Sequence, residues 1–513
     1  MLGVSWKPYA LFESEGPPAE RFRSLFLPLL ALLFLLYLVL STPATPDLFI
    51  HLLSGNLILK AGRIPKADVF SFTAVGRPWH NHEWLYAVTL SAVADLLGAF
   101  GLHLVRLLLV FSTFLLLFLQ VRSRLPPATR PLAYFLLLPV ALLCQPGFSF
   151  RPHLITYFSI ALLPLLLPPD TDRFHFHSFL FVPLITLWAN CHGGFIIGLG
   201  YLSVWLLGGF FEKHFPANHT YRGPLRPLLF LLLLSFPATL INPYGFSLWQ
   251  WLVRGLTNPL TGTHLSEWRA WNPKLRSPTT WAFFVLGAAT LAAICREILR
   301  HRCRSAFLLS AGLAGALLAV RNLPLFALLV PVPLAAAFRS EVKVKERHER
   351  NSSRSASIRI VSNLALAVAL FAVLLRLPSP ATLFLVRIPD RMPRREMLFL
   401  RTIATPYRNL GTPLNWGTYL SWHLWPRYRV SLDLRYDTVY PLETIREWQF
   451  QIFRGTADAL PLLDRYGAEI VLAPRHGPLE HLLASDPHWT ARFSGPNATV
   501  FFRKPLLSLS AGR

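Results

Sequence analysis

The sequence predicts an α-helical membrane protein with about eleven transmembrane helices, followed by a small α/β domain at the C-terminal end. Of the 513 residues, 53% are hydrophobic and only 15% are charged, whereas a soluble domain carries about 25% charged residues. The charges are clustered, so that long uncharged runs such as 25–39 and 228–240 lie between them. A helix of about 20 apolar residues crosses a bilayer core of about 30 Å, and several runs approach that length.

The apolar runs give the position of each predicted span. The first run, Phe22–Ser41, is long and lacks a small-residue cleavage site, so we expect a retained helix rather than a signal peptide. The shorter run Trp84–Leu97 carries Asp95, and we expect it to lie on the outer surface or to dip into it rather than to cross. The predicted spans are centred near residues 32, 110, 139, 160, 182, 203, 235, 288, 313, 330 and 369.

Basic residues orient these spans. The formal net charge is +24, but the basic residues lie in short loops between apolar helices, which is typical of the positive-inside rule and not of a nucleic-acid-binding face. With the N-terminus in the cytoplasm, the basic loops 122–130, 213–226, 296–304 and 339–359 all fall on the cytoplasmic side. We therefore exclude nucleic acid as a partner. The four cysteines show no paired spacing and predict neither a disulfide framework nor a zinc site.

The composition changes after the last predicted span. Residues from about 380 onward are rich in Pro, Arg, Asp and Trp, and short β-like runs alternate with amphipathic segments. The expected strands are Tyr428–Leu432, Glu469–Leu472 and Ala498–Phe502, and the expected helices are Leu442–Phe453 and Ala457–Tyr466. We predict a transmembrane domain at 1–379, whose outer loop 43–100 carries juxtamembrane helices, and a soluble extracytoplasmic α/β domain at 380–513.

Polar residues gather at the helix ends that this topology places outside. Ionisable groups at membrane depth are costly and usually line a cavity or a pathway, so their convergence predicts a site at the outer membrane boundary. The residues at these outer ends are Asp47, His51, Asp68, His82, Glu83, Arg151, His153, Asn190, His192, Asn242, Glu267, Arg321 and Asn322.

Asp47 and His51 are four residues apart and share one face if they lie on a helix. The carboxylate could act as a general base or hold a metal, with the imidazole tuning it. Alternatively, Asp47 is a helix N-cap after Pro46 and His51 is an interfacial residue. Further along, His80 and His82, together with Glu83, could bind a metal. The alternative is an interfacial belt, which we favour for the tryptophans of this segment.

Two arginines, Arg151 and Arg321, lie at outer helix ends with a proline close by. Arginine is suited to bidentate phosphate binding, although such residues also extend toward lipid headgroups. Because both arginines run against the positive-inside trend, they favour a function. Two glycines follow His192 and would allow close backbone approach, or they mark a break in helix packing.

Several motifs together resemble a known superfamily. The longest is Gly62-Arg-Ile-Pro-Lys-Ala-Asp-Val-Phe-Ser-Phe-Thr-Ala-Val-Gly-Arg-Pro-Trp-His-Asn-His-Glu-Trp-Leu85. The others are Trp188-Ala-Asn-Cys-His-Gly-Gly194, Asn242-Pro-Tyr-Gly245, Glu267-Trp268, Arg321-Asn322, Trp416-Gly-Thr-Tyr-Leu420 and Ser431-Leu-Asp-Leu-Arg435. This pattern resembles a bacterial branch of the GT-C superfamily of polytopic membrane glycosyltransferases, distantly similar to protein mannosyltransferases and to lipid A aminoarabinose transferase-like enzymes.

The resemblance implies transfer of a sugar from a polyprenyl-phosphate donor to a glycan, lipid or protein acceptor outside the bacterial inner membrane. It implies that Asp47 is the catalytic base or positions the acceptor, with His51 beside it. Expected substrate-binding residues are Arg151, His153, Asn190, His192, Glu267, Arg321 and Asn322, and secondary candidates are Asp68, His82 and Glu83. The sequence identifies no cofactor with certainty and leaves a divalent metal as an option.

Two other functions are compatible with the sequence. A transporter of lipids or lipid-linked glycans would need polar residues through the middle of the spans and on both faces, and few are found at mid-span. A non-catalytic scaffold of envelope assembly would use the C-terminal domain as its interaction module. This sequence also departs from the superfamily pattern, because Arg151 and His153 stand where an acidic residue often assists.

Overall fold

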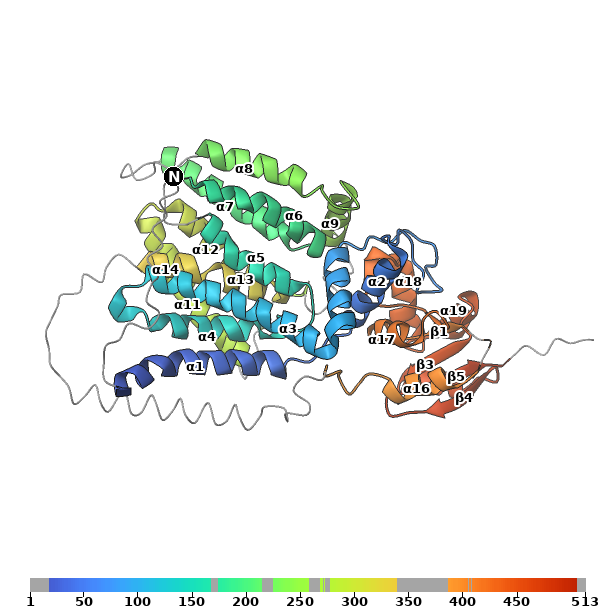
Figure 1. The fold of residues 1–513 in the computed structure, drawn as a ribbon. Helices are drawn as coiled ribbons and strands as arrows, with labels where there is room; N and C mark the ends of the chain where they lie inside the picture. The colour runs from blue at the N-terminus through green and yellow to red at the C-terminus, as the bar shows by residue number, and fades with distance from the viewer. Residues whose placement is uncertain are drawn as a thin grey trace, which may run out of the picture.

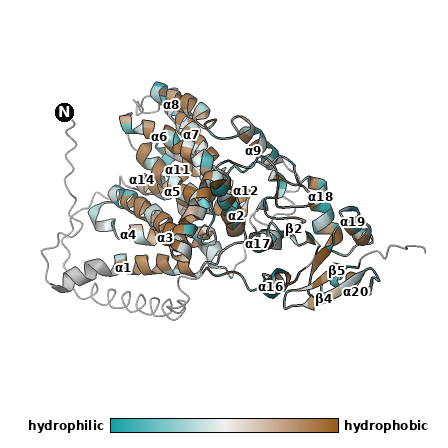
Figure 2. Cartoon of the chain, turned by 45° about the vertical axis from the view of Figure 1, so that its right-hand side comes forward, coloured by the Kyte–Doolittle hydropathy of each residue, from teal (hydrophilic) through white to brown (hydrophobic). Residues whose placement is uncertain are grey.

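The computed structural model describes residues 18–167, 174–214, 225–257, 268–270, 272, 277–338, 386–404, 406 and 408–504. A block of helices forms one end of the molecule, and a region with a small β-sheet forms the other (Figure 1). Hydrophobic residues dominate the helical block, whereas the sheet region mixes hydrophobic and hydrophilic residues (Figure 2).

Apolar helices occupy the predicted spans. Within the described residues, three helices are long and apolar enough to cross a membrane, and 320–338, a pair bent by 43°, would make a fourth. Shorter apolar helices lie at the other predicted centres, except that the span at 369 lies outside the described residues. The helices are α1 (Pro18–Ser41), α4 (Leu132–Cys144), α5 (His153–Leu166), α6 (Phe181–Cys191), α7 (Phe195–His214), α8 (Leu225–Ala238), α11 (Pro278–Leu299), α12 (Cys303–Leu318), α13 (Leu323–Leu329) and α14 (Pro331–Phe338).

Helix α3 (Trp84–Arg124) consists of two segments that meet at Gly98. Gly98 has φ 59° and ψ −149°, a conformation that glycine adopts far more readily than other residues. The segment before it runs in a different direction from the rest of α3 and lies beside α2 (Asp47–Ala61) (Figure 1). This is the segment that we expected to lie on the outer surface or to dip into it. The two helices pack closely because Gly55 has no side chain, and a Cβ there would lie 2.1 Å from the carbonyl oxygen of Ala87.

The C-terminal region holds a five-stranded sheet in the order β2-β1-β3-β5-β4. Strands β1, β2 and β3 are parallel, while β5 pairs antiparallel with β3 and β4. The strands are β1 (Asn409–Gly411), β2 (Arg429–Val430), β3 (Ile470–Pro474), β4 (Trp489–Ser494) and β5 (Ala498–Arg503). The helices are α16 (Arg394–Thr402), α17 (Leu414–Leu424), α18 (Leu442–Arg446) with its continuation Glu447–Ile452, α19 (Ala459–Arg465) and α20 (Pro478–Ser485). The three strands and two helices expected from the sequence therefore form.

The first outer loop packs into the C-terminal region. Val430 of β2 forms a parallel bridge with Ser71, and its N–H donates to the carbonyl of Phe70 at 3.2 Å. Phe70 and Trp79 share one hydrophobic core with Leu432 and other residues of the sheet region. The loop and the C-terminal region are thus one packed unit, while the predicted boundary at residue 380 lies outside the described residues.

Candidate active site

Helix α2 presents Asp47 and His51 at the junction of the helical block and the sheet region. Pro46, and not Asp47, occupies the N-cap position, so Asp47 is the first helical residue. Its carboxylate forms an ion pair with Arg151, whose Nε lies 3.1 Å from Asp47 Oδ2. Both side chains are about one-quarter exposed (23% for Asp47 and 26% for Arg151), which leaves the pair accessible to a ligand.

A second carboxyl group, Glu83, lies among three histidines. The Nε2 atoms of His51 and His192 are each 3.8 Å from a Glu83 oxygen, and that of His82 is 3.6 Å away. These residues come from α2, from the loop before α3 and from the end of α6. His82 is held by stacking on the ring of Trp251 in α9 (Ser247–Thr257), with ring centroids 3.9 Å apart.

The hydrogen bonds of His192 fix its tautomer. Its Nδ1 accepts the backbone N–H of Gly194 at 3.0 Å and lies 2.7 Å from the hydroxyl of Thr156. A nitrogen that accepts a backbone N–H cannot carry a proton, so the neutral ring carries its proton on Nε2. His192 therefore presents an N–H group to Glu83.

Burial sets the charges of this cluster. It raises the pKa of Glu83 to about 8, the negative charge of Asp47 adds to that rise, and Arg151 and Arg321 oppose it. Burial also lowers the pKa of His51 to about 4 and that of His82 to about 3. At neutral pH the two imidazoles are neutral and most Glu83 side chains hold a proton.

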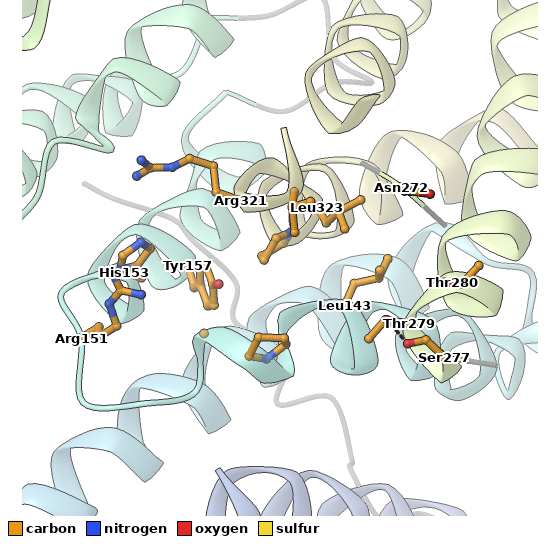
Figure 3. A pocket seen from close by; sticks show the side chains of 14 residues that line it. Leu143, Arg151, His153, Tyr157, Asn272, Ser277, Thr279, Thr280, Arg321 and Leu323 are labelled. Carbon is orange, nitrogen blue, oxygen red and sulfur yellow. Dashed lines mark hydrogen bonds between the residues drawn. The ribbon is translucent and has the colours of Figure 1, made fainter. Parts of the chain in front are cut away.

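Two cavities meet at the Asp47–Arg151 pair. The larger, of about 290 Å³, contains Arg151, His153 and Arg321 at one end, while Leu143 lies toward the other end beside Ser277, Thr279 and Thr280 (Figure 3). Most of its exposed surface is apolar. The smaller, of about 80 Å³, is polar and contains Asp47. Its further lining residues include His51, His82, Glu83, Trp79, Leu434, Arg435 and Thr438. Arg151 therefore belongs to the apolar cavity while its partner belongs to the polar one.

Not every predicted site residue faces these cavities. Asn190 accepts a hydrogen bond from Trp84 and donates to two carbonyls, and Asn322 donates to the carbonyl of Gly315, so both stabilise loops and helix ends. Asp68 is fully buried and forms an ion pair with Arg435 at 2.5 Å. Glu267 lies outside the described residues. The predicted site residues that do lie at the two cavities or beside Glu83 are Asp47, His51, His82, Glu83, Arg151, His153, His192 and Arg321.

The site residues predicted from the sequence did not include the wall that the C-terminal region contributes. Leu434, Arg435 and Thr438 line the polar cavity together with residues of α2 and of the first outer loop. The segment Ser431–Arg435 carried a signal, because it was one of the motifs of the superfamily resemblance. Within the described ranges, no three His, Cys, Asp or Glu side chains are placed to hold a metal ion, so the structure assigns no metal ligand.

Solved structures with a similar fold include membrane glycosyltransferases. The Archaeoglobus fulgidus oligosaccharyltransferase, tethered to an acceptor peptide with the NVT sequon, aligns with a TM-score of 0.54 and 11% identity over 93% of this chain and 74% of that chain. The apo form of the same enzyme aligns with a TM-score of 0.52 and 12% identity, over 88% of this chain and 69% of that chain. ArnT from Cupriavidus metallidurans bound to undecaprenyl phosphate aligns with a TM-score of 0.49 and 11% identity, over 94% of this chain and 98% of that chain. No protein-family model and no curated protein matches the sequence.

The oligosaccharyltransferase likeness confirms the fold that the sequence resemblance predicted. The helical block and the sheet region of this chain together share the overall fold of that oligosaccharyltransferase.

Proposed function

We propose that this protein transfers a sugar from a polyprenyl-phosphate donor to an acceptor hydroxyl on the outer face of the membrane. One observation carries the proposal: Arg151 lines an apolar cavity together with Arg321, while its ion-pair partner Asp47 lines the adjoining polar cavity. A phosphate on an apolar tail suits the first cavity, and a hydroxylated acceptor suits the second. The likeness in fold to an oligosaccharyltransferase supports the same class of reaction.

The donor side of the site is built for an anion attached to a hydrocarbon. Arg151 and Arg321 lie at one end of the larger cavity, and Arg321 is held by the indole of Trp268, 3.9 Å from the ring centroid. Leu143, Pro146 and Leu323 offer an apolar surface for the lipid. Fixed guanidinium groups stabilise the charge that develops on a phosphate leaving group.

The reaction needs one proton transfer. The acceptor oxygen attacks the anomeric carbon, the bond from that carbon to the phosphate oxygen breaks, and its electron pair remains on the phosphate. The acceptor proton passes to a carboxylate of the polar cavity, which contains Asp47 and Glu83. The products are a glycoside and the free polyprenyl phosphate.

The proposal includes the position of the protein in the cell. Eleven spans with a cytoplasmic N-terminus in a bacterial inner membrane would place the C-terminal region outside. The wall formed by Leu434, Arg435 and Thr438 would then meet the acceptor, which could be a glycan, a lipid or a protein.

The test is binding and turnover by the full-length protein in lipid nanodiscs. Polyprenyl phosphate is the binding probe, and a panel of polyprenyl-phosphate sugars serves as donors. We expect Arg151→Lys and Arg321→Gln to weaken binding of the lipid phosphate at least tenfold, because each loses a forked phosphate contact. Arg446→Gln, an exposed arginine in α18, is the matched control.

Two outcomes would contradict the proposal. If wild type binds no polyprenyl phosphate and turns over no donor while remaining folded, a non-catalytic scaffold becomes the better interpretation. If wild type moves polyprenyl-phosphate sugars between the two leaflets without cleaving them, the protein is a transporter.

A further inference from the structure

We infer that Glu83, rather than Asp47, takes the proton of the acceptor hydroxyl, and that His192 positions the Glu83 carboxyl for this step. The inference rests on the proposed function and specifies how its site works. It depends on the different partners of two carboxyl groups that line the same polar cavity.

Asp47 is already paired. Arg151 Nε lies 3.1 Å from its Oδ2, so the carboxylate already binds a cationic group. Using Asp47 as a base would also require its bond to Arg151 to weaken during the reaction. We assign Asp47 to positioning, because it holds the guanidinium that faces the apolar cavity.

Glu83 has no such partner. Within the described residues, the groups that lie within ion-pair distance of its carboxyl are imidazoles, at 3.6–3.8 Å, and no lysine or arginine lies that close. The side chain is 21% exposed and lines the cavity, so an acceptor can reach it. Its oxygens are therefore not held by a guanidinium, and one of them can take a proton from the acceptor hydroxyl.

The surroundings of Glu83 include charged groups at longer range. Asp47 raises its pKa, while Arg151 and Arg321 lower it without cancelling the effect of burial. The titratable and charged groups that surround it are Asp47 and His51 of α2, His82 of its own loop, Tyr86 of α3, Arg151 before α5, Cys191 and His192 at the end of α6, Arg321 before α13 and Arg435 of the C-terminal wall.

His192 is the positioning residue. Its Nδ1 is occupied by the N–H of Gly194 and the hydroxyl of Thr156, and the latter accepts the indole N–H of Trp188 at 2.8 Å. The ring is therefore fixed with its Nε2–H toward Glu83 Oε1. At 3.8 Å this group acts as an oriented dipole or through one bridging water. Either way it stabilises the carboxylate form of Glu83.

The step is balanced within the proposed reaction. The acceptor O–H bond breaks and its proton forms an O–H bond with a Glu83 oxygen, while the acceptor oxygen bonds to the anomeric carbon. The electron pair of the broken glycosyl–phosphate bond remains on the phosphate. Protonated Glu83 then releases its proton to solvent through the exposed part of the cavity.

Infrared difference spectroscopy tests the protonation of Glu83 without any substrate. We expect full-length wild type to show a carboxylic-acid band that disappears with a midpoint near pH 8. Glu83→Gln should lack the band, and Glu443→Gln, an exposed glutamate of α18, should keep it. A band that persists in Glu83→Gln, or a Glu83 midpoint near that of a free glutamate (about 4.3), would overturn the inference.

The kinetic test separates this inference from the proposed function. Glu83→Gln should bind polyprenyl phosphate like wild type but transfer sugar about 10²–10⁴ times more slowly. His192→Gln should move the midpoint of the pH–rate profile upward, because the carboxylate loses a stabilising N–H. Wild-type transfer that survives Glu83→Gln overturns the role of Glu83 alone. Absence of both binding and transfer in wild type overturns the proposed function and this inference together.

Discussion

Arg151 bonds to Asp47 and at the same time faces the apolar cavity, so the protein and a bound phosphate would share its charge. In the proposed complex the phosphate would compete with Asp47 for the guanidinium. A carboxylate that holds an arginine in this way keeps it oriented before the ligand arrives, which lowers the entropy lost on binding. Asp47 thus matters to the site even though Glu83 takes the proton.

Replacing Asp47 by asparagine tests this division of roles. The charge of Asp47 raises the pKa of Glu83, so its removal should shift the midpoint of the pH–rate profile below that of wild type. The rate should fall as well, because Arg151 loses its anchor. The measurement is sugar transfer from a polyprenyl-phosphate donor between pH 5 and 10. If the pH dependence vanished and a flat residual rate were left, Asp47 would be the base.

The raised pKa of Glu83 has a consequence for stability. Between the pKa of the unfolded chain, about 4.3, and the folded value of about 8, the native state holds a proton that the unfolded state has lost. Stability therefore falls as the pH rises through this window and levels off above it. Glu83→Gln removes this loss, so we expect its midpoint of thermal unfolding to exceed that of wild type increasingly from pH 5 to pH 8.

The control for this comparison is Glu443→Gln, which should follow wild type at every pH. A constant difference between Glu83→Gln and wild type across the range would mean that the Glu83 carboxyl titrates normally. A more stable variant that has lost its activity would illustrate the usual conflict between a functional site and stability.

At the scale of elements, α2 carries Asp47 and His51, and Glu83 immediately precedes the first segment of α3. The separation of these two helices therefore determines the site. Gly55→Ala would bring a methyl group to 2.1 Å from the carbonyl oxygen of Ala87, and one helix must move away. We expect a lower unfolding midpoint and a loss of transfer of at least tenfold, since misplacement by 1 Å can cost about 10²-fold.

Gly200→Ala in α7 is a matched control, because the space around Gly200 is open and alanine favours a helix. Equal stability and activity of Gly55→Ala and Gly200→Ala would show that the two helices are not in close contact. Both variants are compared by thermal unfolding and by sugar transfer from a polyprenyl-phosphate donor.

Arg435 joins the first outer loop to the sheet region. Its guanidinium makes bonds of 2.7–3.1 Å to both oxygens of Asp433 and one of 2.5 Å to Asp68, and it lies against the rings of Phe70 and Trp79. Arg435→Met would leave two buried carboxylates without a cation, at a cost of about 3–5 kcal/mol. Thermal unfolding checks this, with Arg446→Gln as control. An unchanged midpoint would contradict the buried network.

At the scale of the whole molecule, sequence predicted the helices better than it predicted the site. Runs without charges such as 25–39 specify apolar helices by themselves, since each satisfies its backbone locally. Strand β1 has only three residues and left no pattern to detect. The bridge between Ser71 and Val430 joins distant parts of the chain, and neither segment carries a local signal for the other.

The site shows the same limit. The sequence predicted that Asp47, Glu83 and Arg151 gather at one face, because topology alone brings outer helix ends together. It could not predict that Arg151 pairs with Asp47 and leaves Glu83 to the imidazoles, since this depends on distances of a few ångströms. The tautomer of His192 likewise depends on the N–H of Gly194, which only the fold places at Nδ1.

The shared core makes a strong prediction about the C-terminal region. A chain that ends at residue 379 would expose Phe70 and Trp79, leave Asp68 without Arg435 and remove one wall of the polar cavity. We expect such a chain to unfold at a lower temperature and to lose binding of polyprenyl phosphate, although Arg151 and Arg321 are still present. A chain that ends at Lys504, which keeps all five strands, is the control and should behave like wild type.

If the shorter chain keeps its stability and its lipid binding, the C-terminal region is a separable module, as a scaffold would use it. Loss of both properties would instead mean that this region is part of the site's own framework, because α2 rests on it through the hydrogen bond from Thr418 to the carbonyl of Pro46.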